Sequence, residues 1–207
     1  ESLVDRLRGM YAFAIWDKKR KRLFVARDIF GIKPLYYAQM NGTLMFASEI
    51  KAFMEHPKFD KIFNEDALGN YLSFQFVPTN ETFFKGVFCL QPGHYFTYEN
   101  GEMKITRYFE PDFTGDNTKS FEEVVDEVEA VMKESVEKHK ISDVEVASYL
   151  SSGVDSSYLT WLGQVDHTFT VGFDEGQYSE IQDAKEFAAS INMENDAKVI
   201  TPDEYWD

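Results

Sequence analysis

Cysteine, basic residues and long apolar runs are all scarce in this sequence of 207 residues. The single thiol, Cys89, can form neither an internal disulfide nor a cysteine-rich metal site, which favours a reducing compartment and a cytoplasmic protein. Lys and Arg number 21 against 36 Asp and Glu, and this net charge of −15 disfavours nucleic acid as a partner, because phosphate binding needs clustered basic side chains. No run of about 18 apolar residues exists, so we expect neither a membrane-spanning segment nor a secretory leader.

Apolar residues make up 43 % of the sequence, which is ordinary for a globular protein able to build a core. The length is compatible with one large domain or two small ones. Residues 1–10 have a helix-like composition, and residues 201–207 resemble the first turn of another helix. We therefore expect the sequence to be part of a longer protein.

The first half of the chain has the pattern of antiparallel strands joined by tight turns. Asn41-Gly42 and Asn100-Gly101 are two-residue hairpin signals, and a turn is expected at 91–93. Asn64 is placed to cap a helix. The expected strands are 11–17, 23–27, 36–39 and 43–47, with further strands on either side of the turn at 91–93 and after residue 101, and the expected helices are 49–55 and 65–74.

The second half has a different pattern, in which helices and strands alternate. Ser120 and Glu123 form a capping-box signature ahead of an amphipathic helix that reaches residue 139. Alternation of this kind is typical of a parallel sheet wrapped by helices. We therefore predict a first domain at 1–112, a polar linker at 113–119 and a second domain at 120–207. In the second domain the expected strands are 144–150, 167–173 and 197–200, and the further helices are 156–162 and 179–191.

The loop SSGVDSS, at residues 151–157, lies between a predicted strand and a predicted helix. A helix start offers backbone N–H groups without internal partners and the positive end of the helix dipole, which together attract anions. Gly153 lets the backbone approach a phosphate closely, and the serine hydroxyls add donors. Asp155 would repel a bare anion, but it suits a Mg²⁺ ion that bridges phosphates. Val171 and Gly172 end the next parallel strand, where ligands bind in such sheets.

A simpler interpretation is also open for this loop. Short Ser/Gly motifs recur by chance, and Asp155 could be only a helix cap in a strand-to-helix turn. The common P-loop pattern is absent, because no Lys follows the glycine. The histidines are scattered without metal-ligand spacing, and we expect Cys89 to be a buried core thiol.

Three segments of the first half and the loop of the second resemble one enzyme family. The string GMYAFAIWD at 9–17, RDIFGIKPLY at 27–36 and FASEIKAF at 46–53 resemble class II glutamine amidotransferase domains. The loop at 151–157 resembles the SGGxDS loop of enzymes that cleave ATP to AMP and pyrophosphate, with Ser152 in place of the middle glycine. In this order they resemble glutamine-dependent asparagine synthetases, over nearly the whole chain.

That resemblance implies a partial α+β domain with the β-sheet layers of an Ntn-type glutaminase, followed by a partial α/β domain with a doubly wound parallel sheet like that of adenine nucleotide α-hydrolases. It implies a ligase that uses ATP and Mg²⁺, with aspartate and glutamine as further substrates, β-aspartyl-AMP as intermediate, ammonia from glutamine hydrolysis, and a possible homodimer. The Mg²⁺ ion would be held by Asp155 through the pyrophosphate. The implied ATP-binding residues are Leu150, Ser151, Ser152, Gly153, Val154, Asp155, Ser156, Ser157, Val171 and Gly172.

Some parts of the family pattern are missing from this sequence. The family's glutaminase nucleophile is an N-terminal Cys, whereas residue 1 of this sequence is Glu, and the glutamine-binding NGE phrase and the later SGEGSDE segment are also absent. We therefore expect the chain by itself to be inactive. Two alternatives stay open: a related ligase that acts on another acceptor acid, such as a β-lactam synthetase-like enzyme, and a non-catalytic scaffold that has kept the fold.

Overall fold

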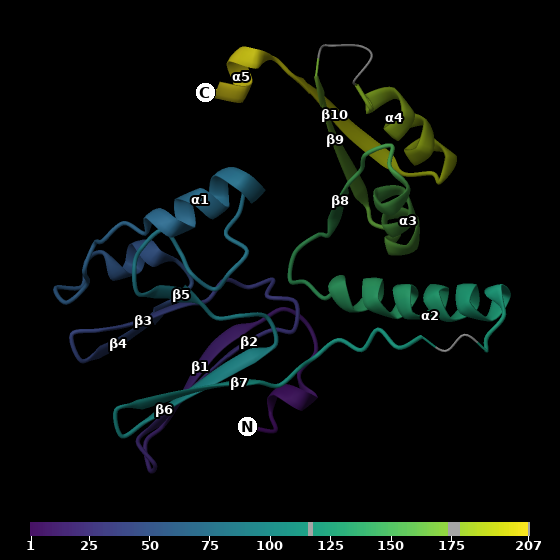
Figure 1. The fold of residues 1–207 in the computed structure, drawn as a ribbon. Coiled ribbons are helices and arrows are strands. Elements are labelled where there is room, and N and C mark those ends of the chain that lie inside the picture. The colour runs from purple at the N-terminus through teal and green to yellow at the C-terminus, as the bar shows by residue number, and fades with distance from the viewer. Residues whose placement is uncertain (116–117, 174–178, 207) are drawn as a thin grey trace. The chain divides into compact units, whose positions relative to one another are not determined.

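The computed structural model describes residues 1–115, 118–173 and 179–206 (Figure 1). The chain forms two compact units, residues 1–114 and 115–207, and each is described by itself. Residues 116–117 of the predicted linker lie outside the described residues. In the described part of the chain, no helix is long and apolar enough to cross a membrane.

The first unit is built from two antiparallel sheets and short helices (Figure 1). One sheet has the strand order β1-β2-β6-β7, and the other has the order β4-β3-β5. The elements in chain order are η1 (Val4–Arg6), β1 (Ala12–Asp17), β2 (Arg22–Arg27), β3 (Tyr36–Met40), β4 (Thr43–Ala47), η2 (Ile50–Phe53), α1 (Glu65–Phe74), β5 (Val87–Cys89), β6 (His94–Glu99) and β7 (Glu102–Arg107).

Both predicted hairpins are confirmed, and their turns have the expected geometry. Asn41 and Gly42 have φ angles of 48° and 72°, and Asn100 and Gly101 have φ angles of 53° and 85°. Two successive positive φ angles make the type I′ turn whose twist matches the flanking strands. The first turn joins β3 to β4, and the second joins β6 to β7.

Aromatic and aliphatic side chains join the two sheets of this unit. Tyr37 of β3 and Phe96 of β6 are buried, and their ring centroids are 5.7 Å apart. They belong to a cluster with Val25, Leu35 and Leu90. Burying a large apolar side chain contributes about 1.5–3 kcal/mol, so this cluster is a main source of the unit's stability.

A corner with two buried charged side chains, Arg27 and Asp28, follows β2. The carboxylate of Asp28 is 1 % exposed and accepts hydrogen bonds from four backbone N–H groups, those of Tyr11, Phe30, Ile32 and Lys33. The guanidinium of Arg27 donates to the carbonyls of Lys33, Gly31 and Leu90. These two side chains therefore hold the backbone of the corner in place.

Gly31 completes this corner for two physical reasons. Its φ angle is 65°, in the left-handed region that glycine adopts without strain. A Cβ atom there would lie 2.8 Å from Pro92 and 3.0 Å from the guanidinium carbon of Arg27.

The prediction that Cys89 is a buried core thiol is wrong, because the side chain is half-buried and its Sγ accepts a 3.0 Å hydrogen bond from Arg27.

The second unit contains a three-stranded parallel sheet with the order β10-β9-β8 (Figure 1). The predicted capping box is present, since Ser120 accepts from the N–H of Glu123 and Glu123 accepts from the N–H of Ser120. The elements are α2 (Phe121–His139), β8 (Ala147–Tyr149), α3 (Val154–Gly163), β9 (His167–Phe173), α4 (Ile181–Ser190), β10 (Glu194–Ile200) and α5 (Pro202–Trp206).

Helices α3 and α4 lie on one face of this sheet. Thr168, Thr170 and Gly172 of β9 point to that face and are buried, whereas Phe169 and Val171 point to the other face and are 40 % and 50 % exposed. The parallel pairing of β9 with β8 and with β10 confirms the predicted parallel sheet. Within the described residues no helix covers the second face of β9, so double winding and the adenine nucleotide α-hydrolase-like fold remain predictions.

Several predicted boundaries shift. Strand β8 is shorter than the predicted 144–150, and β10 starts at Glu194 instead of residue 197. Residues 50–53 form a 3-10 helix in place of the helix expected at 49–55. Asn64 does occupy the N-cap of α1, but its side-chain amide donates to the Thr82 carbonyl and does not cap the helix.

We predict that Asp28→Asn lowers the free energy of unfolding by about 3 kcal/mol at pH 7, because an amide would set donor against donor in a buried site. Burial raises the pKa of Asp28, but its four backbone donors outweigh burial and hold the pKa below the ordinary value. A lowered pKa gives stability that is present above the unfolded pKa and lost as pH falls through the folded one.

Denaturant unfolding from pH 7 down to pH 2 tests this prediction. The difference in the free energy of unfolding between wild type and Asp28→Asn should become smaller below about pH 4. The control is Asp17→Asn, since Asp17 also accepts backbone N–H groups but is exposed, and this change should have a much smaller effect. A gap that is the same at every pH would contradict the role given to the Asp28 carboxylate.

Candidate anion-binding site

The candidate loop at 151–157 leaves the sheet between β8 and α3, and the residue directly before it is fixed to β9. Leu150 is buried, its N–H donates to the Phe169 carbonyl at 2.8 Å, and its carbonyl accepts from the Thr170 hydroxyl at 2.8 Å. Both backbone groups of Leu150 are therefore held within the sheet. The predicted contact of Leu150 with a nucleotide would use a residue that is rigidly placed.

Two of the loop serines bind each other. The hydroxyls of Ser151 and Ser156 are 2.8 Å apart, and the Ser156 Oγ also lies 3.1 Å from the Ser151 carbonyl. Ser151 Oγ accepts from the N–H of Gly153 at 3.2 Å. These bonds close the loop on itself, so Ser151 and Ser156 shape the turn. The hydroxyls of Ser152 and Ser157 have no hydrogen-bond partner among the described residues.

The start of α3 presents backbone donors that have no acceptor. The first helical bond runs from the N–H of Ser157 to the carbonyl of Gly153 at 3.1 Å. The N–H groups of Val154, Asp155 and Ser156 come before it and have no acceptor within the described part of the chain. Since the helix dipole also places positive charge here, the geometry suits an anion.

Gly153 contributes space and not an unusual backbone conformation. It is the N-cap of α3 with φ −71° and ψ 150°, which any residue can adopt. A Cβ atom on Gly153 would lie 3.3 Å from Ser151 Oγ, a tight contact. A side chain at this position would therefore disturb the serine pair that shapes the loop.

Asp155 is not the helix cap of the simpler interpretation. Helix α3 begins at Val154, two residues before the predicted start, so Asp155 lies inside the first turn. Its exposed carboxylate has no hydrogen-bond partner among the described residues. Those residues also contain no cluster of three or more His, Cys, Asp or Glu that could hold a metal ion. A cation at Asp155 would need oxygen ligands from a bound phosphate, as Mg²⁺ commonly has.

Val171 and Gly172 both lie near the carboxyl end of β9, but they point to opposite faces. Val171 borders a hollow of about 360 Å³ on the uncovered face, together with Tyr149, Phe169 and Lys198. Gly172 is buried beneath α4, where a Cβ atom would lie 2.7 Å from Ile181. The structure therefore brings Val171 near exposed aromatic side chains and gives Gly172 a packing role.

Two residues around the loop are absent from the sequence-based prediction. Glu180, just before α4, accepts a 3.4 Å hydrogen bond from the N–H of Ser152 through its Oε2 atom. Thr170 holds the Leu150 carbonyl. Both contacts join residues at least 20 positions apart in sequence, and no local pattern indicates them.

Comparison with known proteins assigns the class. Residues 1–109 match the model of the glutamine amidotransferase domain, and residues 127–207 match the model of asparagine synthase. Since the first match covers more than half of the chain, the chain belongs to the glutamine amidotransferase domain family. The two matches in this order confirm the predicted resemblance to the asparagine synthetases.

The relatives agree with this family. The chain is 42 % identical over 210 residues to asparagine synthetase [glutamine-hydrolyzing] 1 of Bacillus subtilis, covering 99 % of this chain and 33 % of that protein. It is 39 % identical over 218 residues to a putative asparagine synthetase of Mycobacterium tuberculosis H37Rv, covering 98 % and 33 %. The chain thus spans about a third of the length of these relatives.

Two further similarities are more distant. Amidase chyE of Penicillium rubens is 35 % identical over 196 residues, which cover 84 % of this chain and 29 % of that protein. Among solved structures, a glutamine phosphoribosylpyrophosphate amidotransferase of Bacillus subtilis matches with 17 % identity and a TM-score of 0.34, covering 94 % of this chain and 33 % of that one. The structural similarity is too low to support a conclusion about fold or function.

We predict that Gly172→Ala destabilises the second unit by about 1–3 kcal/mol, because its Cβ would force Ile181 and the start of α4 away from the sheet. Alanine alone would favour the strand by roughly 0.5–1 kcal/mol, so a loss of stability isolates the steric clash. Thermal or denaturant unfolding measures it. The control is Gly69→Ala in α1, where a Cβ meets nothing within 4 Å and the helix should gain stability. Equal gains from both changes would contradict the packing role of Gly172.

Proposed function

We propose that the protein containing this chain makes asparagine from aspartate and ATP, using ammonia released from glutamine. The chain has glutamine amidotransferase and asparagine synthase matches in one sequence, and it spans about a third of its relatives. The observation that carries the proposal is the start of α3, where three unpaired N–H groups lie beside the free carboxylate of Asp155. This combination suits a pyrophosphate group with a bound divalent cation.

In this proposal the amides of Val154, Asp155 and Ser156 bind the β- and γ-phosphates, and the free hydroxyls of Ser152 and Ser157 add donors. Asp155 would hold Mg²⁺ through the pyrophosphate, and the ion would supply charge neutralisation for that leaving group. Val171 and the hollow beside it receive the adenosine part. The site then works by positioning and charge neutralisation, without a covalent bond to the protein.

The reaction follows from that placement. A β-carboxylate oxygen of aspartate attacks the α-phosphorus, the bond from that phosphorus to the bridging oxygen breaks, and pyrophosphate leaves with the electron pair. Ammonia then attacks the acyl carbon of β-aspartyl-AMP, loses a proton, and releases AMP. The first unit, with an Ntn-type glutaminase fold in this proposal, belongs to the domain that supplies the ammonia.

A related ligase with another acceptor acid is the second candidate. The 35 % identity to amidase chyE supports keeping it, because that relative is named for amide chemistry and not for asparagine. Both candidates adenylate a carboxylate at the same loop. They differ only in the acid that is consumed.

We predict that the full-length protein, supplied with Mg²⁺-ATP and ammonia, releases pyrophosphate from ATP only when aspartate is also present. The measurement is a coupled pyrophosphate assay with aspartate, with other amino acids, and with no acid. Release that depends on another acid would favour the second candidate. No release under any condition would contradict both and favour a scaffold without chemistry.

Asp155→Asn should raise KM for Mg²⁺-ATP at least about tenfold, because a charge-assisted contact with the bound cation is lost. The control is Asp183→Asn, which removes an exposed acid from the first turn of α4 and should leave KM within about twofold. Unfolding of both variants should resemble the wild type. Unchanged KM in Asp155→Asn would show that Asp155 does not hold the cation.

A further inference from the structure

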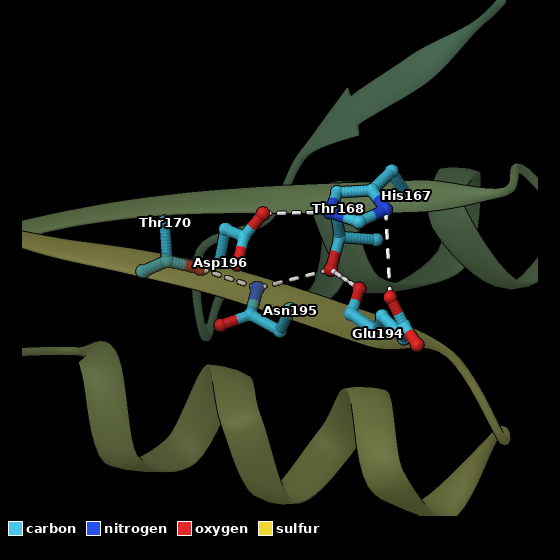
Figure 2. Close-up of polar contacts among 6 residues, drawn as sticks. All are labelled: His167, Thr168, Thr170, Glu194, Asn195 and Asp196. Atoms are coloured by element: carbon cyan, nitrogen blue, oxygen red, sulfur yellow. Dashed lines mark hydrogen bonds and ion pairs between the residues drawn. The ribbon is translucent and has the colours of Figure 1, made fainter.

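A chain of hydrogen bonds joins the side chains of β9 and β10 (Figure 2). The side-chain nitrogen of Asn195 on β10 donates to the hydroxyl oxygens of Thr168 at 3.0 Å and Thr170 at 2.9 Å, both on β9. Thr168 is 0 % exposed and Thr170 is 3 % exposed. Each threonine hydroxyl in turn donates to a backbone carbonyl, Thr168 to Glu194 at 2.7 Å and Thr170 to Leu150 at 2.8 Å.

The direction of every bond in this chain is fixed. A backbone carbonyl can only accept, so each threonine must use its one proton on its carbonyl. Both threonine oxygens are then acceptors, and Asn195 must turn its NH₂ group toward them. This explains why Asn195 Oδ1 is buried without a hydrogen-bond partner, since the reverse orientation would set its oxygen against two acceptors.

The two threonines share their strand, sheet face, burial and hydrogen-bond donor, but they bind different backbone carbonyls. They lie on the same strand and the same face, both are buried, and both receive a hydrogen bond from Asn195. Thr168 binds back to β10, at the carbonyl of Glu194. Thr170 binds the carbonyl of Leu150, which follows the end of β8 and directly precedes the loop.

We propose that Thr170, oriented by Asn195, is a positioning residue for the loop at 151–157. Strand β8 ends at Tyr149, so the carbonyl of Leu150 has no strand partner and Thr170 supplies the missing donor. Together with the bond from the Leu150 N–H to Phe169, this fixes the backbone from which the serine pair and the first turn of α3 extend. The proposal rests on the proposed function for its kinetic consequence, but not for its structural one.

The structural test measures amide hydrogen exchange in the full-length protein without ligands, at the N–H groups that are hydrogen-bonded within the loop, those of Ser151, Gly153 and Ser157. Thr170→Val keeps the shape and removes the hydroxyl, and we expect exchange in the loop to become at least about tenfold faster. Thr168→Val removes an equally buried hydroxyl and should leave loop exchange within about twofold. Thr170→Ser restores the hydroxyl and should return exchange close to that of the wild type.

The kinetic test uses the same three variants in the pyrophosphate assay. Thr170→Val should raise KM for Mg²⁺-ATP by about tenfold or more, while Thr168→Val and Thr170→Ser stay within about twofold of the wild type. The midpoint temperature of thermal unfolding should fall to a similar extent in both valine variants. A general loss of stability would therefore affect the KM values of both variants alike. Equal effects of the two valine variants on loop exchange, or no effect of Thr170→Val, would overturn the proposal.

The two proposals fail in different ways. An inactive wild type would contradict the proposed function, and the exchange experiment would still decide the role of Thr170. An active wild type with equal behaviour of Thr168→Val and Thr170→Val would contradict the role of Thr170 alone.

Discussion

The second unit depends on hydrogen bonds to the buried backbone N–H and carbonyl of Leu150, at the point where the short parallel strand β8 ends beside the longer β9. Strand β8 pairs with β9 only from Ala147 to Tyr149, whereas β9 continues to Phe173. Buried backbone groups without partners are costly, so the chain after β8 can turn away only if Leu150 keeps its bonds. The Phe169 carbonyl and the Thr170 hydroxyl provide them, and the loop is thereby free to present its amides outward.

The first unit meets a similar requirement with charged side chains. After β2 the chain makes a compact corner in which backbone N–H groups donate to Asp28 and the carbonyls of Gly31 and Lys33 accept from Arg27. A buried carboxylate and guanidinium are stable there because each has several backbone partners. In both units a side chain binds backbone groups that no strand pairs, and in both it does so within or beside a segment that the family resemblance already marks.

The sequence predicts those features that depend on neighbouring residues. The hairpins at Asn41 and Asn100, the capping box at Ser120 and the alternation of parallel strands with helices all follow from local conformation and periodicity, and the structure has them. The start of α3 is missed because Asp155 resembles a helix cap, although Gly153 occupies the N-cap and Ser156 pairs with Ser151.

Long-range contacts explain the remaining errors. The first residues of β10 are polar, so they do not resemble a strand, yet Asn195 is held there by two threonines of β9. Cys89 lies in an apolar stretch that hides its bond to Arg27, 62 residues away. Of the candidate site, the sequence indicates the loop and Asp155 but neither Thr170 nor Glu180, since their contacts exist only after folding.

The transfer of oxygen from aspartate to AMP tests the account most directly. The full-length protein is given aspartate labelled with ¹⁸O in the β-carboxylate, unlabelled ATP, Mg²⁺ and ammonia, and the products are examined by mass spectrometry. Adenylation of aspartate predicts AMP that carries one ¹⁸O atom, together with unlabelled pyrophosphate. Unlabelled AMP, or ADP and phosphate in place of AMP and pyrophosphate, would contradict it.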